Sequence, residues 1–133
     1  MDYSKMSDFE INAEVFETLH GGAPDYKEGD DGAMVLISYE GDVVGGDAVE
    51  VEVERGVFNP CNNVAEAWPI IVERKINIEW HEWKNSEWKS YALNNATTKS
   101  YYDTNPLRAA MIVFLMMQEL LNVPANSTGS DIR

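Results

Sequence analysis

One segment near the end of the chain, residues 106–121, is apolar on nearly every side of a helix, and this constrains the fold more than any other feature. Its large apolar residues are Leu107, Met111, Ile112, Val113, Phe114, Leu115, Met116, Met117, Leu120 and Leu121. A helix that is hydrophobic all round must be covered on several sides. With Asn105 as its cap and Pro106 at its first position, we predict a central C-terminal helix. The rest of the chain covers it, or a second copy covers part of it.

Two more helices are predicted from capping residues and apolar spacing. Residues 8–20 follow Ser7, which forms a capping-box pattern with the glutamate three residues later. Residues 64–75 follow Asn63, which starts the same pattern. Pro69 removes one backbone hydrogen bond there, so the alternative is a short turn followed by a new helix that begins at Pro69.

Four segments have the composition or alternation of strands: residues 34–39, 48–54, 76–83 and 87–93. The second segment alternates valine with glutamate, which predicts a half-buried strand with one face in water. The last two flank a short turn and predict a hairpin. The polar stretches at 21–33, 40–42 and 94–104 are predicted to be a mobile loop, a turn and a loop.

Together these elements predict an α+β fold. We expect a small antiparallel or mixed sheet of about four strands, packed with three helices in the order α-β-β-α-β-β-α, with the C-terminal helix at its centre. The length of 133 residues suits a single domain. We place this domain at residues 1–122 and expect a frayed or disordered tail at 123–133.

The net charge of −13 is concentrated in the first half of the chain. Residues 1–67 hold 16 acidic and 3 basic side chains, whereas residues 68–133 hold 7 of each. Nucleic acids and anionic membranes attract lysine and arginine, so direct nucleic-acid binding is disfavoured and no membrane partner is expected. The chain has one cysteine, and its first residues lack the pattern of a secretory signal. We therefore expect a protein of a reducing compartment, the cytoplasm.

The sequence has no motif for catalysis, a cofactor or a metal, and we predict none of these. His20 and His81 have no partner at metal-ligand spacing. Cys61 is expected to be a lone buried or half-buried thiol. Residues 25–32 resemble a calcium loop only superficially, because non-ligand residues occupy ligand positions. An enzyme with a carboxylate site assembled from loops is kept as an alternative.

The predicted 76–93 hairpin holds the only aromatic and basic cluster of the sequence: Trp80, Trp83, Trp88, Lys84 and Lys89. Aromatic stacking with nearby cations is how single-stranded nucleic acid is bound. Three glutamates interleave with this cluster and cancel its charge. We therefore favour tryptophans that pack across the hairpin, and keep a nucleic-acid-associated accessory protein as an alternative.

Glu50, Glu52 and Glu54 form a row on one side of the predicted 48–54 strand. Alternate residues of a strand lie ~6.8 Å apart, so this row could imitate a run of phosphates and dock a nucleic-acid-binding protein. The alternative is a solvated face that prevents pairing at the strand edge.

Three blocks of the sequence resemble the NinX family of lambdoid phages and enterobacterial prophages. The blocks are MDYSKMSDFEIN (Met1–Asn12), NPCNNVAEAWPIIVERKINI (Asn59–Ile78) and NPLRAAMIVFLMMQE (Asn105–Glu119). The resemblance implies an accessory protein of the phage early region, where recombination and replication accessory genes lie. It implies no activity and carries over no functional residue.

On these grounds we expect a non-enzymatic module that binds a host or phage protein, and a homodimer is also considered. The candidate partner-binding residues are Asn62, Asn63, Trp68, Arg108, Glu50, Glu52 and Glu54. Asn63 is already explained as a helix cap. Arg108 lies in the first turn of a helix, where the helix dipole opposes a cation. We therefore predict that Arg108 pairs with a carboxylate or faces a partner.

Overall fold

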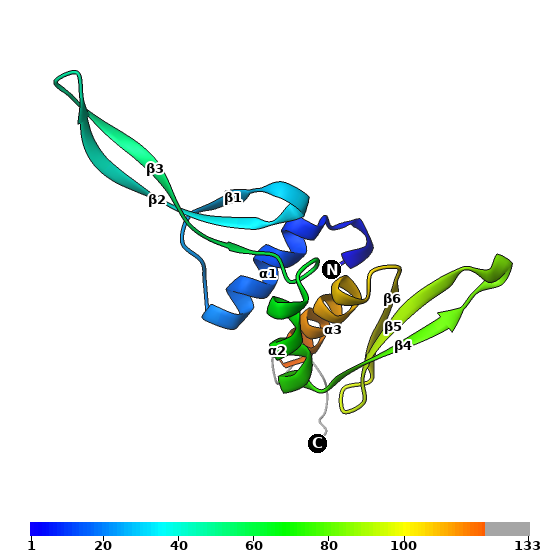
Figure 1. Cartoon of the computed structure of the whole chain (residues 1–133). Coiled ribbons are helices and arrows are strands. Elements are labelled where there is room, and N and C mark those ends of the chain that lie inside the picture. The colour runs from blue at the N-terminus through cyan, green and yellow to red at the C-terminus, as the bar shows by residue number, and fades with distance from the viewer. Residues whose placement is uncertain (122–133) are drawn as a thin grey trace.

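The structure, a computed structural model, describes residues 1–121 and contains three helices and two three-stranded antiparallel sheets (Figure 1). The helices are α1 (Asp8–His20), α2 (Val64–Arg74) and α3 (Pro106–Leu121), and the strands are β1 (Tyr26–Glu28), β2 (Met34–Val44), β3 (Asp47–Phe58), β4 (Ile76–Glu82), β5 (Trp88–Asn94) and β6 (Lys99–Asp103). The first sheet has the order β1-β2-β3 and the second β4-β5-β6. The predicted α+β class and its order of helices and strand pairs are confirmed. Two short strands are added, and the strands form two sheets.

The centre of the fold is α3, as its all-round apolar sequence predicts. It packs against α1, α2 and all three strands of the second sheet. Its buried residues are Ala109, Ala110, Met111, Ile112, Val113, Phe114, Leu115 and Met117. Elements of the same chain cover α3, whereas Leu120 and Leu121 at its end are exposed.

The predicted caps form at all three helices. The Glu10 amide donates to Ser7 Oγ (3.1 Å) and the Ser7 amide donates to Glu10 Oε1 (2.8 Å), which completes the capping box of α1. Asn63 Oδ1 accepts from the second residue of α2, and Asn105 Oδ1 accepts from Leu107 of α3. The second helix runs without interruption through Pro69, so the alternative of a new helix at this proline is wrong.

The segment 21–33 was predicted as a mobile loop, and this is wrong for its second half. Residues Tyr26–Glu28 form β1, which pairs with β2 from Leu36 to Met34. A 3-10 turn follows and brings Gly32 against α1, where an added Cβ would lie 2.8 Å from Asp8 Cβ. Contacts with β2 and α1, which local composition does not reveal, order this part of the segment.

The turn predicted at 40–42 is also wrong, because β2 continues through these residues to Val44. The chain reverses at Gly45 and Gly46, whose φ angles are 61° and 88°. A two-residue hairpin turn of this kind requires positive φ at both positions, which glycine adopts at little cost. The Gly-Gly pair therefore sets the turn and lengthens the hairpin.

Residues 94–104 were predicted as a polar loop, but residues Lys99–Asp103 form β6 at the edge of the second sheet. Asn94 organises the turn before β6. Its Oδ1 accepts from the amide and the hydroxyl of Thr97, and its Nδ2 donates to the carbonyl of Arg74. The buried amide thus joins the β5–β6 turn to the end of α2.

Two β hairpins project from the helical core in different directions (Figure 1). We call residues 38–55 of β2 and β3 the acidic arm, and residues 79–90 of β4 and β5 the tryptophan arm. Val49 and Val51 are 37% and 40% exposed, so the predicted burial of one face of this strand is wrong. The three arm tryptophans are also about half exposed, and their predicted packing across the hairpin is incomplete.

None of the helices within residues 1–121 is both long and apolar enough to cross a membrane. The tail predicted at 123–133 lies outside the described residues, as does the predicted domain end at residue 122.

We predict that Phe114→Asp prevents folding. Phe114 is fully buried in α3, beside the guanidinium of Arg74 at 4.9 Å from its ring centroid. Loss of a buried phenylalanine alone costs ~3–5 kcal/mol of the free energy of unfolding, and a buried carboxylate adds to this cost. Circular dichroism and thermal melting would show the loss of structure.

The matched control for this variant is Leu121→Asp, because Leu121 ends the same helix and is 69% exposed. It should melt at nearly the same temperature as the unmodified chain. A soluble Phe114→Asp variant with unchanged melting would show that α3 is not the core.

Candidate functional site

Arg108 joins the N-terminal segment, α1 and the start of α3, and it pairs with two carboxylates as predicted. Its guanidinium donates to Asp103 Oδ2 (3.0 Å) and Asp8 Oδ1 (2.9 Å). It also donates to the carbonyls of Tyr3 (3.1 Å) and Met6 (2.7 Å). Burial disfavours the charged form, but the hydrogen bond with Asp8 and the charge of Asp103 outweigh burial and raise the pKa of Arg108. Arg108 therefore stays charged while it is largely enclosed.

An asparagine network lies beside this arginine. Asn12 is fully buried and uses its whole side-chain amide. Its Nδ2 donates to the Gly32 carbonyl (2.9 Å) and to Asn59 Oδ1 (2.8 Å), and its Oδ1 accepts from the Cys61 amide (3.1 Å). A buried amide with such partners stabilises the meeting point of several segments, because any change leaves polar groups unsatisfied.

Asn62 and Asn105 extend the network to the surface. Asn62 Nδ2 lies within hydrogen-bond distance of Asp8 Oδ2 and of the Asp31 carbonyl, both at 3.0 Å. Asn105 Nδ2 donates to the Cys61 carbonyl at 2.7 Å. These contacts join all three blocks of the sequence that carry the family resemblance. They give Asn62 and Arg108 structural roles, and Asn63 acts as the cap of α2.

The lone cysteine, Cys61, is fully buried inside this network. Burial, followed by the nearby charge of Asp8, raises the pKa of the thiol to about 12. The thiol is therefore protonated near neutral pH and is a poor nucleophile. Within residues 1–121, no group of three or more His, Cys, Asp or Glu side chains is placed to hold a metal ion.

The three predicted glutamates lie on one face of the acidic arm. Glu50, Glu52 and Glu54 alternate along β3 opposite Gly41, Tyr39 and Ile37 of β2. Lys27 of β1 forms an ion pair with Glu52 and lies 3.8 Å from Glu54. The row of carboxylates is present, but Lys27 partly neutralises its inner end.

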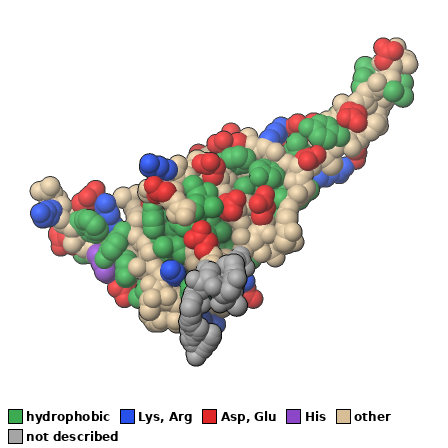
Figure 2. Space-filling view, turned by 180° about the vertical axis from the view of Figure 1, so that it is seen from behind, with side chains coloured by type: hydrophobic (Ala, Val, Ile, Leu, Met, Phe, Trp, Pro, Cys, Tyr) green, Lys and Arg blue, Asp and Glu red, His purple; other side chains and the backbone are tan. Residues whose placement is uncertain are grey.

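The opposite face of the acidic arm carries valines together with charged side chains. Val44, Val49, Val51 and Val53 share it with Asp42, Asp47 and the ion pair between Arg55 and Glu40. Hydrophobic and acidic side chains lie next to one another along the projecting arm in Figure 2. Sequence alternation predicted that the three glutamates share a face, but it predicted neither the carboxylates on the valine face nor that both faces would be in water.

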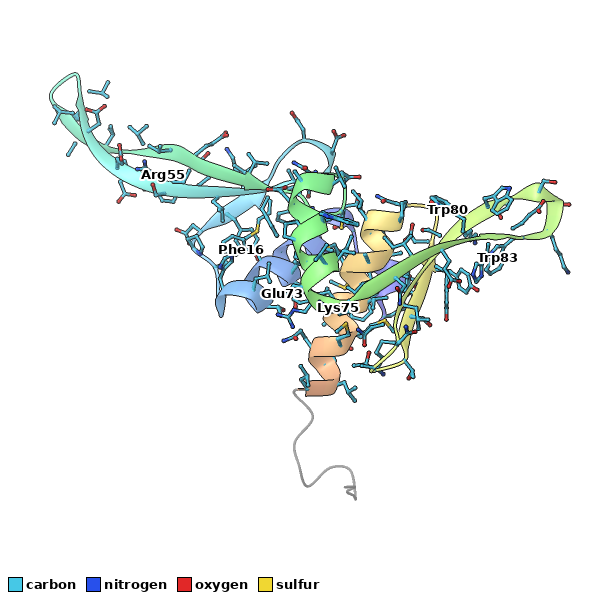
Figure 3. The ribbon with its side chains drawn as sticks, turned by 60° about the horizontal axis from the view of Figure 1, so that its bottom comes forward. Phe16, Arg55, Glu73, Lys75, Trp80 and Trp83 are labelled. Atoms are coloured by element: carbon cyan, nitrogen blue, oxygen red, sulfur yellow. The ribbon has the colours of Figure 1, made fainter. Side chains whose placement is uncertain are left out.

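An aromatic cluster lies at the base of the tryptophan arm, on the side of the second sheet that faces away from α3. The rings of Tyr91 and Tyr102 lie 4.4 Å apart, and Trp83 contacts Tyr102 edge-on at 5.2 Å. His81 Nδ1 lies 2.7 Å from the Tyr102 hydroxyl, and the Lys89 ammonium lies 4.5 Å from the Trp83 ring centroid. Trp80 lies on the other side of the arm from Trp83 (Figure 3). Sequence reasoning placed Tyr91 in the predicted hairpin but missed Tyr102, because it did not predict β6.

Trp68 is the remaining predicted site residue, and it lies apart from the asparagine network on the outer side of α2. It is 56% exposed. A groove of about 700 Å³ begins beside it and runs between the end of α2 and the β5–β6 turn. Its lining is mainly apolar, and among residues 1–121 Glu73 is the single carboxylate that lines it. It therefore lacks the converging carboxylates that the enzyme alternative requires.

We predict that Arg108→Ala lowers the free energy of unfolding by about 2–4 kcal/mol. Removing one partner of a buried ion pair costs ~3–5 kcal/mol because it leaves a buried charge unpaired, and the partial exposure of Asp8 reduces this. Chemical denaturation would measure the change. Arg55→Ala is the matched control, since this exposed arginine pairs with Glu40 on the arm and should contribute less than ~1 kcal/mol. Unchanged stability in Arg108→Ala would contradict the structural role.

The comparison with known proteins bears on the family resemblance that the three blocks carry. No curated protein and no solved structure matches this chain. The family model described as bacteriophage P22, NinX matches residues 2–118, which include nearly all of the three blocks and both arms. The chain therefore belongs to the bacteriophage P22 NinX family.

Proposed function

We propose that this phage accessory protein is a non-enzymatic module that binds a cationic protein of the host or the phage, in the cytoplasm of the bacterial host. The observation that carries this proposal is the acidic arm, a two-stranded ribbon that exposes carboxylates and valines to water. Membership of the NinX family supports the phage setting.

The acidic arm receives little packing support from the other described elements. In the described part of the chain, β2 and β3 pair only with each other beyond the end of β1. An isolated two-stranded hairpin is at best marginally stable in water. Its exposed valines gain free energy when a partner covers them, at ~25 cal/mol for each Å² of apolar surface buried. A partner surface would therefore stabilise the arm as it binds.

The charge of the arm selects the kind of partner. Residues 38–55 carry six carboxylates and one arginine. An acidic surface attracts cationic proteins over a distance and repels nucleic acid and acidic proteins. A partner with lysine or arginine beside apolar residues matches both faces.

We expect the combined substitution Glu50→Gln, Glu52→Gln and Glu54→Gln to weaken binding roughly tenfold, which is about 1.4 kcal/mol. The unmodified protein should capture a partner from uninfected or phage-infected host lysate at low salt and release it at moderate salt, because salt screens exposed charges. Titration of the purified partner would then measure the change in the dissociation constant.

The matched control changes three carboxylates of the tryptophan arm, Glu79→Gln, Glu82→Gln and Glu87→Gln, and alters the net charge by the same amount. It should bind as the unmodified protein does. Equal weakening by both triple variants would mean that only net charge matters. That result would reject the acidic arm as the docking surface.

A second candidate function is association with single-stranded nucleic acid, which the exposed aromatic cluster of the tryptophan arm favours. Bases stack on exposed aromatic rings at ~1–3 kcal/mol each, and Lys89 supplies one cation. In a gel-shift assay at low salt, this function predicts binding of a single-stranded oligonucleotide that Trp83→Ala weakens. If no oligonucleotide shifts, this second function is excluded and the protein-binding proposal remains.

A further inference from the structure

The outer face of α2 is apolar, although it faces water. Val64, Trp68 and Val72 recur every four residues and are 59%, 56% and 49% exposed, and Ala65 and Pro69 lie between them and are also exposed. The opposite side of the same helix buries Ala67, Ile70 and Ile71 in the core. In Figure 1, α2 lies at the front of the molecule, outside α3. Contiguous exposed apolar surface of this kind marks an interaction site.

The groove beside Trp68 extends this apolar surface. Ile71, Ile76 and Met117 contribute to its lining, and Arg74 and Lys75 lie at the end of α2 beside it. Figure 3 shows Glu73 and Lys75 at this end of the helix. Large aromatic side chains beside apolar pockets are common at the centres of protein interfaces.

The charges around α2 are suited to a second copy of the same chain. The helix and the residue after it carry Glu66, Glu73, Arg74 and Lys75, so this surface is neutral in a chain of net charge −13. Two such chains repel each other least where their surfaces are neutral. The two ends of the helix also differ in charge, because Glu66 lies in the first turn and Arg74 and Lys75 lie at the last.

We propose that two copies of this protein associate through α2, with the two helices antiparallel about a two-fold axis at Trp68. Val64 of each copy then packs against Val72 of the other, and the two tryptophans meet at the centre. The last turn of each helix, with Arg74 and Lys75, then lies beside the first turn of the other copy, which carries Glu66. The antiparallel arrangement of the two helix dipoles is also favourable. A two-fold interface of this kind closes on itself.

The association does not depend on the partner of the acidic arm, but it has a consequence for that arm. A dimer presents two acidic arms and two tryptophan arms on one particle. If two arms bind one target, the second contact forms at a high effective concentration and strengthens the first.

The first test is the molecular mass in solution, measured by sedimentation over a range of protein concentrations. The unmodified protein should sediment as a dimer, and Trp68→Lys should raise the dissociation constant at least tenfold without lowering the melting temperature of the monomer. Trp88→Lys is the matched control, since Trp88 has similar exposure on the tryptophan arm, and it should not change the dimer.

The second test fixes the direction of the helices. A Val64→Cys chain and a Val72→Cys chain are mixed and oxidised, and antiparallel helices predict a disulfide-linked heterodimer. Within one helix these positions are ~12 Å apart along the axis, which exceeds the reach of a disulfide. The native Cys61 is fully buried and does not compete.

A monomer at all concentrations, or a dimer that Trp68→Lys leaves unchanged, would overturn the proposal. Homodimers linked through Val64→Cys alone, in preference to the mixed pair, would overturn the antiparallel arrangement. The chain could also be a monomer that captures a foreign protein. If Trp68→Lys abolishes that capture, the α2 face binds the foreign protein and not a second copy.

Discussion

The interaction on which the rest of the structure depends is the set of bonds made by Arg108. One guanidinium holds the carboxylates of α1 and β6 and two carbonyls of the N-terminal segment. The adjoining amides of Asn12, Asn62 and Asn105 then fix the segment between β3 and α2 against α1 and α3. These enclosed polar groups are satisfied by the hydrogen bonds of the amides and of the paired Arg108 guanidinium. The network therefore sets how the three helices pack together.

This polar network divides the molecule into parts with different physical roles. Inside it, α3 supplies the buried core, and the three sequence blocks that carry the family resemblance supply the residues that join the helices. Outside it, the acidic arm, the tryptophan arm and the outer face of α2 expose valine, tryptophan and tyrosine side chains that the described residues leave uncovered. The core explains why the protein folds, and the exposed apolar surfaces are where binding free energy is available.

The candidate sites were only partly predictable from the sequence. Alternation of valine with glutamate gave Glu50, Glu52 and Glu54 a common face, because strand geometry alone determines this. Capping rules gave Asn63 its role, and the helix dipole indicated a carboxylate partner for Arg108. The pairing of Tyr91 with Tyr102 could not be predicted, because β6 is recognisable only through its register with β5.

The sequence by itself determined the three helices, their caps and the central position of α3, since these follow from local hydrogen bonding and from apolar residues that must leave water. Only the tertiary structure decided that 21–33 contains a strand, that Gly45 and Gly46 form the turn, and that the valines of β3 face water. The physical reason is that strand pairing and burial depend on which distant segments arrive alongside. The two-residue period of a strand predicts that its side chains point to two faces. It does not predict which face the fold will cover.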